Sequence, residues 1–213
     1  MLTFLTVQLV HIRRVIKLMK LKILISVTTF LLLATTATAL NLEGRCAIKF
    51  FGESTLSDFD GQAICQPFTL KTEEAAGKAG IIRQPAVKIL VGKMDTDNSS
   101  RDKKMYAMFE QESYPEIQGL FADLDPDVIL QQWQATETNS GSLGFNLMIR
   151  EVSQRVEATI SDLIVTPEQI SFVMKFPLSL ASFQLEPPSV FGMIRVDDKV
   201  RVEVRVFLRK SFD

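Results

Sequence analysis

Met94-Asp-Thr-Asp-Asn-Ser-Ser-Arg-Asp-Lys-Lys-Met105 is the stretch of sequence around which the rest of the chain is organised. It follows a strand-like run at residues 87–91 and leads into a helix-like run that ends near Phe109. Asn98, or one of the two serines after it, can cap this helix by accepting hydrogen bonds from its first free N–H groups. Apolar residues recur at i, i+3 and i+4 from Met105, which gives the helix one apolar face. The stretch therefore predicts a strand-to-helix junction in the middle of the chain.

Residues 1–39 have the pattern of a secretion signal. A basic lead-in precedes an uncharged apolar run at 23–33, and Ala37-Thr-Ala39 has the small-x-small form that signal peptidase accepts. We therefore expect a signal peptide over 1–39, with Met19 as an alternative start, and a single domain over 40–213. A membrane anchor is the alternative, because residues 23–40 are uncharged over 18 positions, about the shortest length that spans a bilayer.

The charge balance of the expected mature domain excludes one class of partner. Of the 24 basic residues in the chain, five lie in 1–39, so residues 40–213 carry 19 basic and 25 acidic residues. A mildly acidic domain whose sequence contains no cluster of basic residues argues against nucleic acid as a partner.

Histidine is missing from the expected mature domain, since the only one in the chain is His11. Ser-His and Cys-His catalysis are thereby excluded, and so is the commonest neutral metal ligand. The acidic residues from Asp95 begin like a calcium loop but have Ser100 where Gly is required and Tyr106 where a bidentate Glu is required. We expect no catalytic residues, no metal site and no enzymatic activity.

Two cysteines, Cys46 and Cys65, lie in the part of the chain expected to be exported. A hairpin that turns near residues 55–56 pairs positions whose numbers sum to 111, which places Cys46 opposite Cys65 and Phe50 opposite Gly61. An even number of cysteines in an oxidising compartment indicates a disulfide. Two buried free thiols remain the alternative.

Period-two alternation recurs along the rest of the domain and predicts antiparallel strands separated by turns. The last strand is the clearest, because aliphatic residues at even positions from Val200 to Leu208 alternate with mostly charged ones. Many strands around one inserted helix indicate an all-β closed barrel or sandwich. The expected strands are 45–51, 60–68, 80–93, 116–124, 128–136, 142–152, 155–165, 169–176 and 200–208, with an exposed link at 71–80.

Alternation also predicts which apolar side chains point inward, although it does not tell whether the interior is hollow. A barrel of about eight strands either fills its interior or holds one small ligand. Each inward residue is therefore a candidate ligand contact or an ordinary core residue. The candidates are Phe50, Phe145, Leu147, Ile149, Phe172, Met174, Phe176, Val202 and Val204.

Polar residues of the central junction offer a second candidate site. Asn98, Arg101 and Asp102 can form a polar mouth that contacts a ligand head group. Alternatively they form a helix cap and a surface tether, because capping alone accounts for Asn98 and Asp102.

Three segments together resemble the YceI-like family. They are the opening hairpin Gly52-Glu-Ser-Thr-Leu-Ser-Asp-Phe-Asp-Gly61, the closing strand at 200–208 and the central signature. That signature is Met94-x-Thr96-x-Asn98-x-x-Arg101-Asp102, followed by Met105 and Tyr114-Pro115-x-Ile117. The resemblance covers essentially all of 45–210.

The resemblance implies a lipocalin-like antiparallel β-barrel of about eight strands with one inserted α-helix, exported to the periplasm. It also implies an elongated apolar cavity that holds a polyisoprenoid or a quinone, and a chain that can pair as a homodimer. Two features depart from the family. Ser57 stands where members often carry a histidine, and the cysteine pair is not a general family feature.

The function we expect is that of an exported lipid-binding protein, which carries or sequesters an isoprenoid or a similar long apolar ligand. We expect no cofactor other than such a bound lipid and no stable insertion into a membrane. The alternatives are an enzyme that acts on an isoprenoid-type lipid and a small outer-membrane barrel, since alternation alone does not tell the inside of a barrel from its outside.

Overall fold

The computed structural model describes residues 40–55, 57–75, 78–137, 140–187, 189–190 and 194–212. The chain divides into two compact units, Met1–Thr38 and Ala39–Asp213, and all of these residues belong to the second. The signal peptide expected over 1–39 lies outside the described residues.

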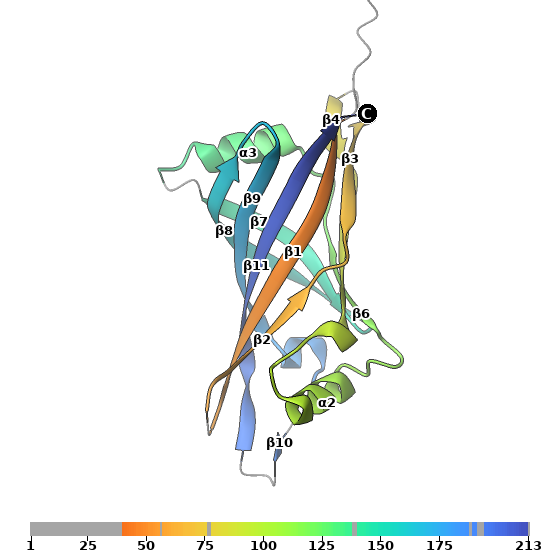
Figure 1. Ribbon diagram of the computed structural model, residues 1–213, viewed down its shortest axis with the longest axis vertical. Coiled ribbons are helices and arrows are strands. Elements are labelled where there is room, and N and C mark those ends of the chain that lie inside the picture. Colours follow the sequence, from red (N-terminus) through yellow and green to blue (C-terminus); the bar gives the residue numbers. More distant parts are fainter. Residues whose placement is uncertain are drawn as a thin grey trace, which may run out of the picture. The chain divides into compact units, whose positions relative to one another are not determined.

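One antiparallel sheet makes up most of the second unit (Figure 1). Its strands follow the order β4-β3-β1-β11-β9-β8-β7-β6-β5, with β2 paired to β1 and β10 paired to β11. The all-β fold expected from the sequence is therefore confirmed. The strands are β1 Leu40–Ser54, β2 Phe59–Ile64, β3 Phe68–Ala75, β4 Lys78–Ile82, β5 Ala86–Leu90, β6 Glu116–Leu120, β7 Gly141–Ile149, β8 Val152–Val165, β9 Gln169–Ser179, β10 Ser189–Val190 and β11 Ile194–Phe212.

The sheet curls until its two sides are linked by isolated bridges. On one side of the curl, Ile82 at the end of β4 exchanges two backbone hydrogen bonds of 2.8 Å with Leu124. Further along, Gln62 of β2 exchanges hydrogen bonds of 2.7 and 2.9 Å with Asp95. These bonds satisfy edge groups that a flat sheet would leave exposed. They also enclose the apolar face of the sheet.

The opening hairpin has the predicted register. Phe50 pairs with Gly61 and Ile48 pairs with Ala63, so large inward side chains lie opposite small ones. On its other side β1 pairs with β11 over thirteen consecutive residue pairs, from Leu40↔Phe212 to Gly52↔Val200. The even-numbered residues of both strands point inward and most are buried.

The predicted junction helix is present as α2, Ser99–Met108, after a short 3-10 helix at Val91–Lys93. Asn98 is its N-cap, because the side-chain oxygen accepts hydrogen bonds from Ser100 N and Arg101 N, both at 3.1 Å. Figure 1 shows α2 at one end of the curled sheet and a second helix, α3, at the other.

The second helix corrects the prediction of a strand at 128–136 and of a single inserted helix. α3 spans Pro126–Gln134, and the Asp125 side chain accepts a hydrogen bond of 3.1 Å from Val128 N. Asp at the N-cap followed by Pro at N1 is a helix-start signal.

Two further predictions near the start of the domain are wrong. Residues 71–80 are not a link, because β3 and β4 pair there, Thr72 with Ile82 and Glu73 with Ile81. Residues 80–93 are not one strand but β4, β5 and the 3-10 helix. Gln84 has φ of 39° just before Pro85, so the chain turns between the two strands. On the two sides of this turn, β4 pairs with β3 and β5 pairs with β6.

The Phe50–Gly61 contact leads to a stability prediction. A Cβ added at Gly61 would lie 2.2 Å from Phe50 Cζ, and the ring is buried in the core. We expect Gly61→Ala to lower the free energy of unfolding by about 1–3 kcal/mol, the usual cost of overpacking. Urea denaturation measures this change.

Gly119→Ala is the matched control, because a Cβ there meets ring atoms only at 3.7 Å, an ordinary contact. It should leave the stability unchanged or raise it slightly. Equal destabilisation by the two substitutions would contradict the packing assigned to Phe50.

Candidate ligand-binding cavities

Two cavities lie inside the curled sheet. The first, which we call the α3-side cavity, has a volume of about 170 Å³ and is lined in part by Ile129, Leu130 and Trp133 of α3. The second, the α2-side cavity, has a volume of about 160 Å³ and is lined in part by Met105 and Met108 of α2. The interior is therefore hollow on both sides of its middle.

Five side chains line both cavities and form what we call the waist ring. Each comes from a different strand, so the ring runs around the interior through β1, β5, β7, β9 and β11. One ligand chain that occupied both cavities would have to pass these side chains. The waist ring consists of Ile48, Ile89, Leu147, Phe176 and Val204.

All nine inward candidates line at least one cavity. Phe145, Phe172 and Met174 line the α3-side cavity, whereas Phe50, Ile149 and Val202 line the α2-side cavity. Leu147, Phe176 and Val204 belong to the waist ring. Their contact with a ligand stays a prediction.

The α3 side chains are the main cavity residues that the sequence reasoning missed. Trp133 is 5% exposed and packs edge-on against Phe172, with ring centroids 5.4 Å apart. Phe145 links this region to the waist ring, because its ring lies 5.1 Å from Phe121 and 5.4 Å from Phe176. The cavity wall therefore combines aromatic rings with a majority of aliphatic side chains. Recognising the Asp-Pro helix start would have revealed the contribution of α3.

The lining is almost free of polar groups. Every residue around the α3-side cavity is apolar, and the α2-side cavity adds only Thr96 and Arg101. Asp102 accepts hydrogen bonds from the backbone N of Thr96 at 3.0 Å and from its hydroxyl at 2.6 Å. The Arg101 guanidinium lies 4.9 Å from the centre of the Phe59 ring.

The three residues of the predicted polar mouth therefore have different surroundings. Asn98 caps α2 and Asp102 holds Thr96, so both stabilise the junction, while Arg101 alone of the three lines a cavity. Tyr106 adds a further tether, since its hydroxyl donates a hydrogen bond of 2.6 Å to Met94 O. Burial, followed by the nearby charges of Asp102 and Asp95, raises the pKa of Tyr106.

The described residues contain no group of three His, Cys, Asp or Glu side chains that could hold a metal ion. None of the helices in the described part of the chain is both long and apolar enough to cross a bilayer.

A sequence profile of the YceI-like domain matches residues 37–208. The chain belongs to this family. The match covers the whole curled sheet apart from the last residues of β11, together with the waist ring and both helices. No curated protein sequence matches the chain.

Two solved structures with the same fold are similar to this YceI-like domain. One is a polyisoprenoid binding domain from Saccharophagus degradans, implicated in plant cell wall breakdown. It matches with a TM-score of 0.57 and 12% identity, over 82% of this chain and 99% of that one. The other is BcnA from Burkholderia cenocepacia, with a TM-score of 0.55 and 12% identity, over 76% and 95% of the two chains. Identities this low show a shared fold alone.

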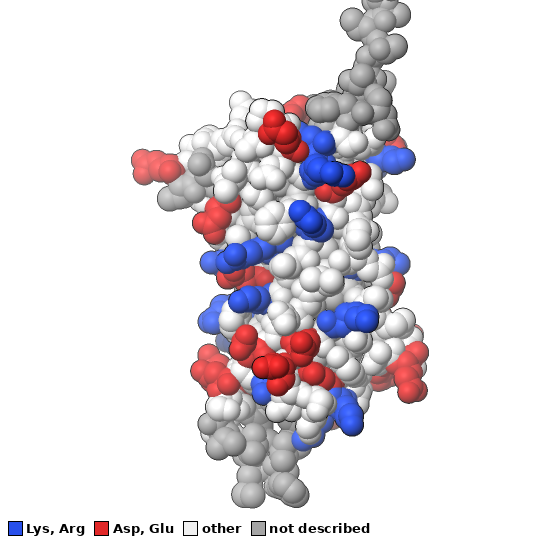
Figure 2. Space-filling model, in the orientation of Figure 1, with Lys and Arg blue, Asp and Glu red and all other residues white. Residues whose placement is uncertain are grey.

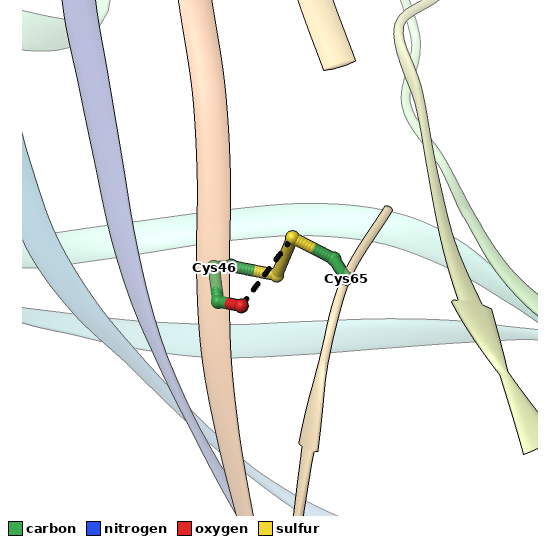
Figure 3. Close-up of a disulfide and its surroundings, with 2 residues drawn as sticks. All are labelled: Cys46 and Cys65. Carbon is green, nitrogen blue, oxygen red and sulfur yellow. Dashed lines mark hydrogen bonds between the residues drawn. A yellow bond between two sulfur atoms is a disulfide. The ribbon is translucent and has the colours of Figure 1, made fainter. Parts of the chain in front are cut away.

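The predicted disulfide joins Cys46 and Cys65, whose Cα atoms are 5.3 Å apart (Figure 3). Both residues are buried, and Cys46 also lines the α3-side cavity. The bond lies where β1 changes partner, since residues 47–52 of β1 pair with β2 and residues 41–44 pair with β3. The disulfide therefore fastens the cavity wall at the junction of two short strands.

We expect the oxidised, folded protein to show no reaction with a thiol reagent until a reductant is added. Replacing both cysteines by Ala should lower the free energy of unfolding by about 3 kcal/mol, because the bond closes a loop between residues 19 apart. Labelling with and without reductant, together with urea denaturation, measures both effects. Immediate labelling of the folded protein would contradict the bond.

Proposed function

We propose that this protein is exported and that it holds a long apolar lipid, of isoprenoid type, inside the two cavities. The observation that carries the proposal is the pair of cavities with almost wholly apolar linings that meet at the waist ring. An apolar chain gains roughly 0.8 kcal/mol for each CH₂ group removed from water. A chain of several prenyl units would then bind without any strong polar contact.

The distribution of polarity supports a binding protein that faces water rather than a barrel embedded in lipid. Along β11 the buried side chains are aliphatic, whereas Arg201, Arg205 and Arg209 point outward and are exposed. A transmembrane barrel requires the opposite arrangement, with apolar side chains outside.

Export is supported by two features of the chain. Residues 1–39 have the basic, apolar and small-residue order of a signal peptide. The Cys46–Cys65 disulfide suits an oxidising compartment such as the periplasm. The fold shared with a polyisoprenoid binding domain is in accord with a lipid cargo.

Native mass spectrometry of protein purified from cells should show a co-purifying apolar ligand. Trp133 is the only tryptophan in the chain and lines the α3-side cavity, so its fluorescence reports directly on binding there. A quinone with a long prenyl tail should quench this fluorescence in a saturable manner.

Val204→Phe should weaken that binding by about tenfold or more, a loss of at least roughly 1.4 kcal/mol, because the phenyl ring fills the waist ring. Val128→Phe is the matched control, since Val128 is 39% exposed on α3 and lines neither cavity. Circular dichroism shows whether each variant folds. A clean apo mass, no saturable quenching, or equal affinity of the two folded variants would count against the proposal.

A further inference from the structure

The outer face of three neighbouring strands concentrates positive charge. β1, β11 and β9 lie side by side, and their odd-numbered residues point away from the cavities. Between residues 43 and 51, 169 and 179, and 199 and 209, seven of these side chains are basic and two, Glu43 and Glu203, are acidic. Beyond these spans, β1 and β11 carry the exposed acidic residues Glu53 and Asp197. We call the surface formed by the three spans the basic face. Its basic residues are Arg45, Lys49, Lys175, Lys199, Arg201, Arg205 and Arg209.

This distribution is opposite to that of the domain as a whole. Residues 40–213 carry 19 basic and 25 acidic residues, yet the basic face holds seven of the former and two of the latter. Figure 2 shows blue side chains spread over the view in which β1, β9 and β11 lie in front, with some red ones among them and a group of red ones in the lower part. The remaining surface is correspondingly acidic.

Three of the seven basic side chains on the basic face pair with carboxylates, and Lys175, Lys199 and Arg201 also line a surface pocket with Glu53, Asp58 and Asp60. Glu203 lies 3.7 Å from Lys175 and 3.6 Å from Arg205, and Glu43 pairs with Arg209. The other four basic side chains have no carboxylate of a described residue within 4 Å. Two of the four lie over aromatic rings, Arg201 at 4.8 Å from the centre of Phe51 and Arg45 at 6.0 Å from that of Phe207.

Exposed apolar side chains lie within and beside the same face. Among the described residues, five large apolar side chains are exposed, and three of them are here: Ile64 at 68%, Ile164 at 55% and Phe207 at 41%. Phe207 pairs with Ser171, and Ser171 pairs with Ile164, so the side chains of Phe207 and Ile164 point to the same side of the sheet. Ile64 pairs with Ala47 and points to that side as well.

We propose that the basic face docks on the surface of an anionic phospholipid bilayer. Guanidinium groups bind phosphate oxygens through paired hydrogen bonds, and four of the seven basic residues are arginines. A basic surface with interspersed aromatic and aliphatic side chains is the combination that holds proteins at the headgroup boundary of a membrane. The opposite charges of the two surfaces attract each other over about one Debye length.

Docking would bring the protein to the membrane that contains the lipid it binds, and in this respect the inference rests on the proposed function. A long apolar chain is scarcely soluble in water, so a protein that takes it up must meet the membrane that contains it. The cavities are lined by the inward side chains of the sheet, so docking through outward side chains leaves their lining unchanged.

The test compares vesicles of equal parts phosphatidylglycerol and phosphatidylcholine with vesicles of phosphatidylcholine alone, using the protein as purified from cells. We expect cosedimentation with the anionic vesicles at low salt and release near 1 M salt, where the Debye length is about 3 Å. The double variant Arg201→Gln, Arg205→Gln should bind at least about tenfold more weakly. Phe207→Ser should also weaken binding, because it removes the exposed ring.

Lys103→Gln, Lys104→Gln is the matched control, since both lysines are exposed on α2 and the loss of charge is the same. It should bind as the parent protein does. Equal binding to both kinds of vesicle, equal weakening by the two double variants, or no binding at all would overturn the inference. The inference would also be overturned if the protein formed a dimer that the Arg201→Gln, Arg205→Gln variant dissociates and the lysine control does not. The basic face would then join two copies of the chain.

Quenching of Trp133 by a prenylated quinone without vesicles separates this inference from the proposed function. The Arg201→Gln, Arg205→Gln variant should take up the quinone with the affinity of the parent. Normal uptake without docking would overturn only the inference. Docking by a parent protein that takes up no apolar chain would contradict only the proposed function.

Discussion

The pairing of β1 with β11 is the constraint on which the rest of the structure depends. Thirteen consecutive residue pairs hold the two strands in one register, and a slip by one residue would turn every inward side chain outward. In the observed register Cys46 faces Val206, Ile48 faces Val204 and Phe50 faces Val202. These three inward pairs form one wall of the interior, and the charged residues between them face the solvent.

The same alternation of inward and outward side chains continues from this wall through the neighbouring strands of the sheet. The waist ring takes one residue from each of five strands, so it exists only if all five share the parity set by β1 and β11. The helices act at the two ends, α2 beside one cavity and α3 beside the other. Phe145 and Phe176 pack edge-on, with ring centroids 5.4 Å apart, where the α3-side cavity meets the waist ring.

Several parts of this arrangement were predictable because they follow from local pattern. The hairpin register, the disulfide and the Asn98 cap each depend on residues close in sequence, and the structure confirms all three. The inward side of the long strands followed from parity. Parity does not tell whether the interior is hollow, because that depends on how five strands are spaced around it.

The mistakes have equally definite causes. The apolar residues of α3 fit a strand and a helix about equally well over so short a run, and only its Asp-Pro start distinguishes them. The basic face was invisible for another reason. Its charges are spaced two apart along three strands, so the sequence shows no basic cluster. Only the pairing of β1 with β11 and of β11 with β9 brings Lys49, Lys175 and Arg205 onto one surface.

The most direct test of the central claim is an electron-density map of the protein crystallised with the lipid that accompanies it from cells. The account predicts one continuous, chain-like density that passes the five side chains of the waist ring and occupies both cavities. Cavities closed by those side chains, or a lipid bound only to the outer face of the sheet, would contradict it.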